Sequence, residues 1–292
     1  MKTTISQLRV FEAVARTGSF SRAAEELGIT QPSVSTQLRA IESHGKQRLI
    51  AREGHTITVT RFGNIVLPKV RAMLSILAEI ERVFDDERSL QSGLLRLGYS
   101  TDQFAMPMIS RFMAAHPGVK VEARSMASID LIDLLRRGLI DAALITARSP
   151  PDGLSCERLR TDPIVLMVPV GHPIAGAGVV TWAELARYPI IRREATSGTR
   201  MIFDEAARAA GVSLRPLIDL GSWESMRAAV LAGMGVGIAV RGEVEPDDRI
   251  AVVGIDDAGL WASHFIAALP EMRHSATIDG LFAIATAFVA GP

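Results

Sequence analysis

The sequence contains a single cysteine, Cys156, among 292 residues. One cysteine cannot form an internal disulfide, and this scarcity fits the reducing cytoplasm. The first residues, MKTTISQLRVFEAVARTG, hold no continuous apolar stretch before a small-residue cleavage site, so we expect no secretory signal. No segment reaches the roughly 20 uncharged apolar residues that a membrane-spanning helix needs. We therefore expect a cytoplasmic protein that does not engage a membrane.

The sequence also lacks the patterns that mark metal and catalytic sites. Its six histidines include no i, i+4 pair, and no second cysteine is present, so we expect no structural zinc site. The phosphate loop GxxxxGK[ST], the dinucleotide motif GxGxxG and the nucleophile elbow GxSxG are missing. The glycine-rich GMGVGIA reads as a helix end that enters a strand. We expect no metal, no cofactor and no enzymatic activity.

Charge of one sign is not in excess over the whole chain, but it is unevenly distributed. Lys and Arg together number 32, as do Asp and Glu. Residues 1–62 hold nine Lys and Arg against five Glu, so this segment carries +4 and the remainder −4. This split suggests that the N-terminal end meets a polyanion. The length and a hydrophobic content of 48% predict two or three packed units.

Three amphipathic helical patterns occupy the first 45 residues. Gly28 suits a helix end with positive φ, Thr30 or Gln31 can cap the next helix, and Pro32 suits its first turn. A short connection of this kind is typical of a helix-turn-helix. The apolar positions with helical spacing are Ile5, Leu8, Phe11 and Ala15, then Phe20, Ala24 and Leu27, then Val34, Leu38 and Ile41.

The third pattern has a polar face of a particular kind. With its apolar residues turned inward, the opposite side holds short hydroxyls, amides and one arginine, and no acid before Glu42. Such side chains can approach base edges and phosphates closely. The alternative is an ordinary amphipathic hairpin with a solvated face. The residues expected at DNA are Thr30, Gln31, Pro32, Ser33, Ser35, Thr36, Gln37 and Arg39.

A short β-unit and a long helix are expected next. HTITVT alternates as a strand does, Glu53-Gly54 is its expected turn, and Arg52 and Arg61 belong to a two-stranded wing that reaches DNA backbone or minor groove. Residues 64–88 contain no glycine and carry an apolar seam with heptad spacing. We expect this seam to pack on a second copy; the alternative is packing within the chain. The seam residues are Val66, Val70, Met73, Leu77, Ile80 and Phe84.

LRVFEAVARTGSFSRAAEELGITQPSVSTQLRAIE, followed by HGKQRLIAR and VTRFGN, resembles the winged helix-turn-helix of LysR-type transcriptional regulators. The resemblance covers about the first sixty residues. It places Gln31 to Ser33, Ser35 and Thr36 at the DNA, with Arg52 in the wing. Thr36 stands where the family usually has arginine, and Arg61 where it has a small residue, with Ile50 and Val59 as further departures. The base preferences of relatives are therefore not carried over.

From Leu94 onward, strand and helix patterns alternate. LLRLGYS, VKVEARS and IDAALIT are expected strands, and MPMISRFMAAH and IDLIDLLRRG expected helices, so a parallel α/β arrangement follows. PIVLMVPV, RPLIDLG, VGIAV and SHFIAAL are further expected strands; GTRMIFDEAARAAG, ESMRAAVLAG and TIDGLFAIATAFV are further expected helices. Cys156 in GLSCERL is expected to be a small buried hydrophobe in a strand.

This remainder resembles the effector-binding domain of the same regulators, which is shaped like a type II periplasmic binding protein with two lobes. The resemblance implies a first lobe of about 94–163 and 265–290 and a second of about 164–264. The chain as a whole is then α/β in class. We expect a DNA-binding domain at 1–62, a linker and dimerisation helix with its hinge at 63–92, and an effector-binding domain at 93–292.

Hydroxyl side chains gather where expected strands end and helices begin. Helix N-termini supply free N–H groups and partial positive charge, so an anion is the natural ligand there, and Arg192, Arg193 or Arg200 can add charge-assisted bonds. Plain helix capping is the alternative, because Ser and Thr are preferred caps. Trp223 and Glu224 either meet an ammonium group or pack and face solvent. The candidate effector residues are Ser100, Thr101, Ser128, Thr146, Thr196, Ser197, Gly198, Thr199, Arg200, Ser222 and Trp223.

The sequence thus predicts a LysR-type regulator of transcription. We expect it to bind paired half-sites in double-stranded promoter DNA as a homodimer or homotetramer, and to respond to a small carboxylate, sulfate, phosphate or phosphonate. The alternatives are a transporter's solute-binding protein and a small-molecule enzyme on the same two-lobed fold. The first needs an export signal and the second a catalytic set. The effector, the operator and the choice between activation and repression do not follow from the sequence.

Overall fold

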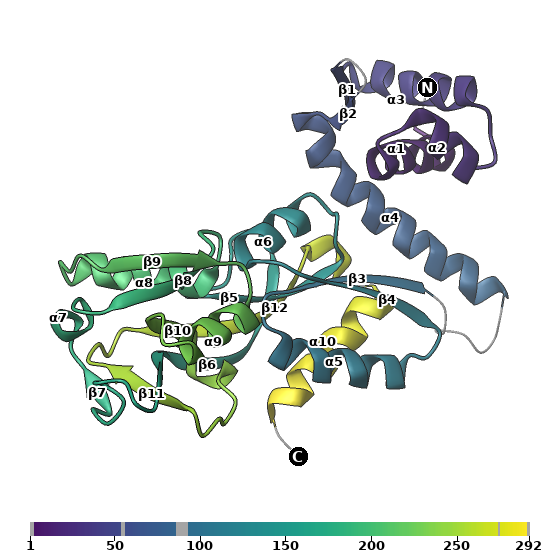
Figure 1. The fold of residues 1–292 in the computed structure, drawn as a ribbon. Coiled ribbons are helices and arrows are strands. Elements are labelled where there is room, and N and C mark those ends of the chain that lie inside the picture. Colours follow the sequence, from purple (N-terminus) through teal and green to yellow (C-terminus); the bar gives the residue numbers. More distant parts are fainter. Residues whose placement is uncertain (1–2, 54–55, 86–92, 274, 291–292) are drawn as a thin grey trace.

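The computed structural model describes residues 3–53, 56–85, 93–273 and 275–290. It has an N-terminal helical unit, a long helix that leads away from it, and a two-lobed α/β unit (Figure 1). Within the described residues, no helix is long and apolar enough to cross a membrane. The α/β class and the three-part order expected from the sequence are both present.

The N-terminal unit packs three helices and a two-stranded sheet around one core. Phe11, Val34 and Leu38 lie at its centre with almost no exposed surface. Ile5, expected on the same apolar stripe, does not join them, since it is 47% exposed. The elements are α1 (Ile5–Thr17), α2 (Phe20–Glu26), α3 (Gln31–Gly45), β1 (Ile50–Glu53) and β2 (Thr56–Val59).

The two strands form the wing expected from the sequence, with a small difference at its tip. Glu53 pairs with Thr56, so Glu53 ends β1 and does not lie in the turn as predicted. Gly54, the other residue of the predicted turn, lies outside the described residues.

Helix α4 (Arg61–Asp85) begins before the predicted linker and contacts both units that it joins. Leu67 and Val70 belong to the core of the N-terminal unit, whereas Ala72 belongs to the core of the first lobe. Gly138 of that lobe also lies close to Pro68: a Cβ added to Gly138 would meet Pro68 Cα at 3.3 Å. The helix is therefore held by both domains and is not a free spacer.

These contacts change the expected dimer seam. Val70 is only 4% exposed, so the structure contradicts its assignment to a partner-facing seam; Val66, Met73 and Leu77 are half-buried. Ile80 is 48% exposed, and the side chain of Phe84 lies outside the described residues. Ile65 and Ile76, which were not predicted, are exposed at 59% and 42%. The exposed apolar surface of α4 thus comprises Ile65, Ile76 and Ile80, and differs from the predicted seam in all but Ile80.

The two-lobed unit is built around a sheet of ten strands, in which β4-β3-β5-β12-β6-β10-β8-β9 are successive neighbours, β11 pairs with β6, and β7 pairs with β11. Its first half comprises β3 (Gly93–Tyr99), α5 (Asp102–Ala115), β4 (Val119–Ser125), α6 (Ser128–Arg136), β5 (Ala142–Ala147) and β6 (Ser155–Pro169). Its second half comprises β7 (Val179–Val180), α7 (Trp182–Leu185), β8 (Pro189–Arg193), α8 (Gly198–Ala209), β9 (Arg215–Leu220), α9 (Trp223–Leu231), β10 (Val236–Val240), β11 (Ile250–Ile255), β12 (Trp261–Ala268) and α10 (Ala276–Ala290).

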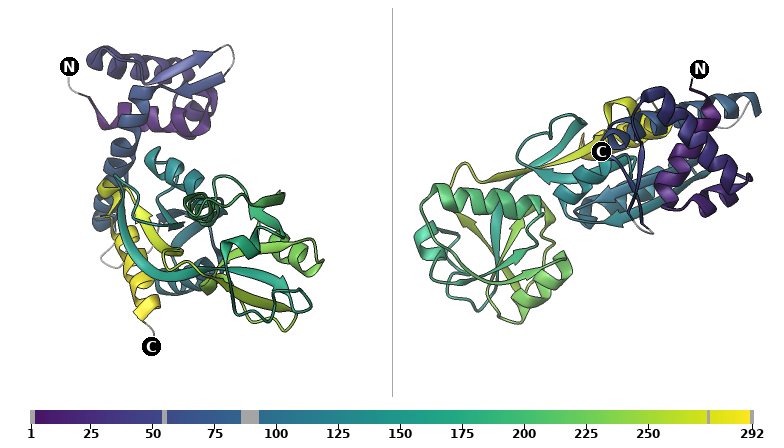
Figure 2. Two further views of the ribbon diagram at one scale, coloured as in Figure 1. Left: turned by 90° about the vertical axis from the view of Figure 1, so that its left-hand side faces the viewer. Right: turned by 90° about the horizontal axis from the view of Figure 1, so that it is seen from above.

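Each lobe has its own layers and core (Figures 1 and 2). In lobe I, α5 and α10 cover one face of the sheet with Phe112 and Phe282, and α6 covers the other with Leu131. In lobe II, α8 and α9 cover opposite faces, through Phe203 and Met226. The sequence patterns predicted these layers, because one apolar stripe per helix needs one sheet face. They missed β7, α7, β8 and β11.

Among the strands of the described residues, β6 and β12 alone run through both lobes. In β6, Leu159 packs in lobe I and Leu166 in lobe II; in β12, Ile266 packs in lobe I and Ala262 in lobe II. The two strands pair antiparallel, and their register shifts at His264, between the two cores. The lobes are therefore joined by a pair of hydrogen-bonded strands with an irregularity at the crossing.

Candidate nucleic-acid interface and interlobe site

The connection between α2 and α3 has the local chemistry expected from its sequence. Gly28 has φ +63°, a value that favours glycine. The Thr30 hydroxyl accepts a hydrogen bond from the backbone N–H of Ser33, and Pro32 lies in the first turn of α3. These caps begin α3 at a fixed angle to α2, as in a helix-turn-helix.

One face of α3 is left open to solvent. Val34, Leu38 and Ile41 are buried beneath it. On the open side the hydroxyl, amide and guanidinium groups are not opposed by a carboxylate until Glu42. This face can bring short donors and acceptors against base edges. Gln31, Pro32, Thr36 and Arg39 are exposed, and Ser33, Ser35 and Gln37 are half-buried.

Two of these expected DNA residues have intramolecular partners. Gln37 accepts from the Ser6 hydroxyl at 2.7 Å and donates to the Ser33 hydroxyl at 3.5 Å. Gln37 therefore links α3 to α1 and holds the face in place. The first acid, Glu42, has a structural role that the sequence did not indicate: its Oε1 accepts from the backbone N–H groups of Leu49 and Ile50, at 2.8 and 3.1 Å. This pair of bonds fastens the wing to α3.

Of the two arginines expected in the wing, Arg52 lies in it, whereas Arg61 is the first residue of α4. Arg52 on β1 and Arg61 at the start of α4 are both exposed. A recognition helix with a basic wing next to it is the geometry used by winged DNA-binding domains, where the helix enters the major groove and the wing follows the backbone.

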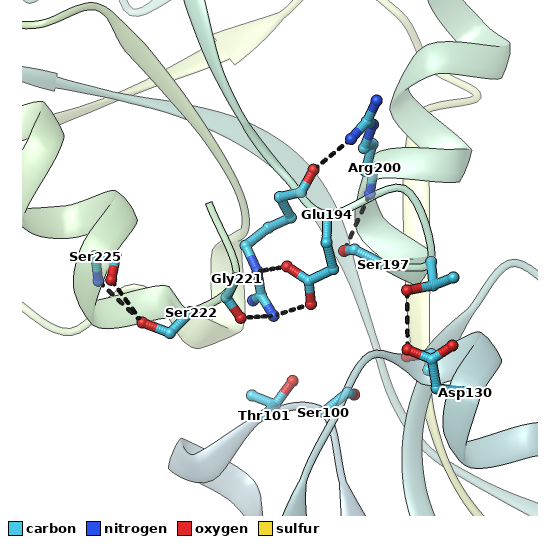
Figure 3. Close-up of polar contacts among 12 residues, drawn as sticks. Ser100, Thr101, Asp130, Glu194, Ser197, Arg200, Gly221, Ser222 and Ser225 are labelled. Atoms are coloured by element: carbon cyan, nitrogen blue, oxygen red, sulfur yellow. Dashed lines mark hydrogen bonds and ion pairs between the residues drawn. The ribbon is translucent and has the colours of Figure 1, made fainter. Parts of the chain in front are cut away.

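The second cluster lies where the lobes meet. Ser100 and Thr101 on lobe I lie opposite Glu194 and Ser197 of lobe II (Figure 3). Ser128 begins α6, and Thr196 to Thr199 form the start of α8. The hydroxyls named from the sequence are thus brought to the junction from five separate helix and strand ends, as expected for such sheets.

Several of these groups already bond to protein. The Ser197 hydroxyl accepts from the N–H of Arg200, and the Ser222 hydroxyl from that of Ser225, so both are helix caps. The buried Ser128 hydroxyl accepts from Thr146 N–H at 2.9 Å. Arg200 Nη1 donates to Asp219 Oδ2 at 3.0 Å and to the Arg193 carbonyl at 2.7 Å. The guanidinium of Arg200 is therefore held within lobe II, and its expected role in anion binding is not favoured.

The lobes are in direct contact at the start of α8. Gly198 is buried, and a Cβ added there would lie 1.9 Å from the backbone oxygen of Thr146 on lobe I. Thr196 Oγ1 donates to Asp130 Oδ2 at 3.0 Å, and Ile129 N–H donates to the Thr196 carbonyl at 3.2 Å. Glycine is required here because two backbones approach each other. Gly198, expected at the effector, therefore contacts lobe I directly.

A third set of contacts bridges the lobes at α5 and α9. With the Gln103 amide oxygen turned toward the indole, it accepts from Trp223 Nε1 at 2.9 Å. Trp223 therefore packs and bonds across the junction. Asp102 and Glu224 face each other at the same place: burial raises the pKa of Asp102, and the nearby Glu224 carboxylate raises it further. The nearby Glu224 carboxylate thus favours the protonated form of Asp102.

The deepest part of the junction holds a chain of polar groups that the sequence did not reveal. Thr101 Oγ1 donates to Glu243 Oε1 at 2.9 Å, and Thr146 Oγ1 bonds to His264 Nδ1 at 3.1 Å. His264 Nε2 is buried without a hydrogen-bond partner, 3.8 Å from Glu243 Oε1. Ser100 extends the chain, 3.4 Å from Thr146 Oγ1.

Burial controls the charge of this chain. It raises the pKa of Glu243 to about 7, against the opposing effect of the Thr101 hydrogen bond. It lowers the pKa of His264 to about 4, and Arg160 nearby adds to this effect. His264 is thus neutral at physiological pH, while Glu243 titrates close to it. Among the described residues, no group of three or more His, Cys, Asp or Glu could hold a metal ion.

Comparisons with known proteins find matches to both parts of the chain. Residues 5–64 match the family described as bacterial regulatory helix-turn-helix protein, lysR family, and residues 88–289 match the LysR substrate binding domain. The HTH-type transcriptional regulator CbbR of Rhodospirillum rubrum is 27% identical over 279 residues, which cover 94% of this chain and 92% of CbbR.

Two solved structures show the same fold. Full-length OxyR from Pseudomonas aeruginosa has a TM-score of 0.79 at 19% identity, covering 98% of this chain and 95% of OxyR. The CcmR regulatory domain from Synechocystis, whose structure is a complex with 2-PG, has a TM-score of 0.62 at 21% identity, covering 68% of this chain and 99% of its own.

Proposed function

The chain belongs to the LysR family of bacterial transcriptional regulators, and on this premise we propose that α3 and the wing bind promoter DNA while a small anion at the lobe junction adjusts that binding. The main observation in support of DNA binding is that the face of α3 that is open to solvent has no carboxylate before Glu42. A regulator that acts on promoters works in the cytoplasm. No catalytic activity is part of the proposal, since its relatives act as regulators.

The DNA-binding residues fall into two groups, those that contact base edges and those that contact phosphates. Gln31 and Thr36 lie on the exposed face and contact base edges, since an amide can pair with adenine and a short hydroxyl with any base. Arg39, Arg52 and Arg61 contact phosphates, and these contacts set affinity and its salt dependence. Thr30 and Ser33 orient the first turn, and Pro32 and Ser35 line the approach to the groove.

The anion binds at the N-termini of α5 and α9, between the lobes. Ser100 and Thr101 precede α5, and Ser222 precedes α9, so free N–H groups and hydroxyls converge there. The CcmR regulatory domain, which has the same fold, was solved in complex with 2-PG, and this supports a small ligand for a domain of this kind. The class is a carboxylate, sulfate, phosphate or phosphonate. Thr146 and Thr199 shape the floor and take no direct part in charge neutralisation.

Assembly follows from the open stripe of α4. Ile76 and Ile80 are exposed large hydrophobic side chains on one helix, and a second α4 covers them. A two-fold dimer places two copies of α3 at paired half-sites, and pairs of dimers form a tetramer. In this division residues 1–62 bind DNA, 63–92 link and dimerise, and 93–292 bind the anion.

The coupling is a population shift between two arrangements of the DNA-binding ends. An anion that prefers one lobe arrangement stabilises it, and α4, fixed to lobe I and to the DNA-binding core, transmits the change. The test is DNase footprinting of the full chain on a promoter fragment selected for binding, with and without each anion class. A footprint and bend identical under every anion would contradict the coupling; failure to select any DNA sequence would contradict the DNA half.

A further inference from the structure

The boundary between the DNA-binding domain, α4 and lobe I encloses two adjoining cavities, of about 710 and 400 Å³. Arg16, Arg71 and Arg96 line both of them. The smaller cavity adds a fourth arginine, Arg124, and a single carboxylate, Glu122. The larger cavity holds the acids Glu12, Glu26, Glu81 and Asp141. The larger cavity is therefore mixed in charge, whereas the smaller cavity has four arginines against one carboxylate.

The four arginines come from both sides of the boundary. Arg16 belongs to α1 and Arg71 to α4, whereas Arg96 lies on β3 and Arg124 on the neighbouring strand β4. In the parallel register Arg96 pairs with Glu122, and Gly98 with Arg124, so Arg96 and Arg124 project from one face of the sheet. Leu139 and Ile140 close the cavity with apolar surface.

Carboxylates of the chain do not neutralise these arginines equally. Arg71 is nearly buried and donates to Glu12, and burial lowers its pKa. Arg96 has only a loose partner, with Nη1 3.9 Å from Asp141 Oδ1. Arg124 forms no hydrogen bond or ion pair with any residue that the structure describes. Glu122 is itself paired with Lys120 Nζ at 3.0 Å.

We propose that the smaller cavity is a second ligand site, which binds a small phosphate- or sulfate-type anion between the DNA-binding domain and lobe I. Guanidinium groups present paired donors that match two oxygens of such an anion. A volume of about 400 Å³ suits a small metabolite, and the leucine and isoleucine wall accepts its carbon skeleton. The site lies outside the lobe junction and does not depend on the effector proposed there.

This anion joins the two parts of the regulator directly. Arg16 and Arg71 hold it from the DNA-binding side, and Arg96 and Arg124 from lobe I. Binding therefore favours the arrangement in which the DNA-binding domain and lobe I are close. It lowers the population of any DNA-binding arrangement in which they are apart.

The test is isothermal titration of the full chain with inorganic pyrophosphate, at fixed ionic strength, for wild type and four variants. Arg124→Gln and Arg96→Gln should each weaken binding at least tenfold. Arg187→Gln removes an equal charge from an exposed position of lobe II and should bind as wild type does. Ser100→Ala alters the anion site proposed at the lobe junction, so it should remove only the part of the binding that occurs there and leave the binding that depends on Arg124. Arg124 is exposed, so its variant folds even where Arg96→Gln does not.

Three results would overturn the proposal. Wild type would show no binding at millimolar pyrophosphate, or Arg124→Gln would bind as tightly as wild type. Alternatively Ser100→Ala alone would abolish binding, which would place the anion at the lobe junction. Without pyrophosphate, Arg124→Gln and wild type should bind DNA with the same affinity. If Arg124→Gln instead loses DNA affinity as strongly as pyrophosphate affinity, these arginines contact DNA phosphates and the ligand site is rejected.

Discussion

Arg71 Nε donates to Glu12 Oε1 at 3.2 Å, and this bond fastens the long helix to the first helix of the DNA-binding domain. The two side chains are only 8% and 15% exposed. Glu12 also accepts from Arg16, and Arg71 reaches the Arg137 carbonyl of lobe I at 3.5 Å. One arginine on α4 thus contacts both domains that the helix connects.

Breaking this pair should destabilise the chain. Glu12→Gln leaves the Arg71 guanidinium buried without its carboxylate, and we expect a loss of about 3 kcal/mol in the free energy of unfolding, measured by urea denaturation. Glu81→Gln is the matched control, because the pair of Arg9 and Glu81 is half exposed and is worth less than about 1 kcal/mol. An equal loss of unfolding free energy in the two variants would show that the buried pair stabilises the chain no more than the exposed pair does.

Gln31→Ala should reduce sequence discrimination more than general affinity. If the amide reads a base edge, its removal costs about 1–3 kcal/mol on the preferred site, or roughly 5- to 150-fold in Kd. Binding to an unrelated DNA of the same length should change little. Competition binding at one salt concentration measures both. A uniform loss on all sequences would assign Gln31 to phosphate contact.

Gly198→Ala should separate the lobes. The added methyl group meets the Thr146 carbonyl, which is backbone and cannot turn aside, so we expect a loss of about 1–3 kcal/mol and a larger radius of gyration by small-angle scattering. Gly176→Ala is the control, because a Cβ at Gly176 meets nothing within 4 Å. An unchanged radius and melting temperature in Gly198→Ala would contradict the close contact.

Glu243 and His264 should give opposite pH dependences. Burial raises the pKa of Glu243 from 4.5 to about 7, so the folded protein keeps a proton that the unfolded chain releases, and stability falls as pH rises through that window. Burial lowers the pKa of His264 from 6.5 to about 4, so the unfolded chain gains a proton that the folded protein excludes, and stability rises between about pH 4 and 6.5.

The two effects largely cancel in the wild type, and a variant should expose one of them. Relative to wild type, Glu243→Gln should gain stability as pH rises from 4.5 to 7, by about 3 kcal/mol in total. His264→Gln should show the reverse trend between pH 4 and 6.5. Urea denaturation across this range measures both, and parallel curves for all three proteins would mean that neither group is titrating as described.

The sequence predicts local features of this fold better than distant ones. Gly28, Thr30 and Pro32 act on their own neighbours, and their roles were visible in a few residues. The apolar stripe of α3 likewise reports burial directly. Val70 shows the limit: its apolar, helical spacing was visible, yet whether a partner or its own domain covers it depends on how α4 lies against the N-terminal core.

The lobe junction could be predicted only in outline. Ser100 and Thr101 were recognised because hydroxyls follow a strand, but the Glu243 that accepts from Thr101 is 142 residues away. Arg200 looked available next to a helix start, and its ties to Asp219 exist only once β9 lies beside β8. Charge and hydroxyl content are local properties, whereas partners are set by the tertiary fold.

The two strands that cross between the lobes also affect the order in which the domains can fold during synthesis. Lobe II is one continuous stretch of chain, whereas the core of lobe I needs Ile266, Ile278 and Phe282, which leave the ribosome after lobe II is complete. The DNA-binding domain and lobe II can therefore fold during translation, while the strands β3 to β5 between them wait for β12 and α10. Until then α4 has no finished surface to dock on, so the contact between the DNA-binding domain and lobe I is among the last to form.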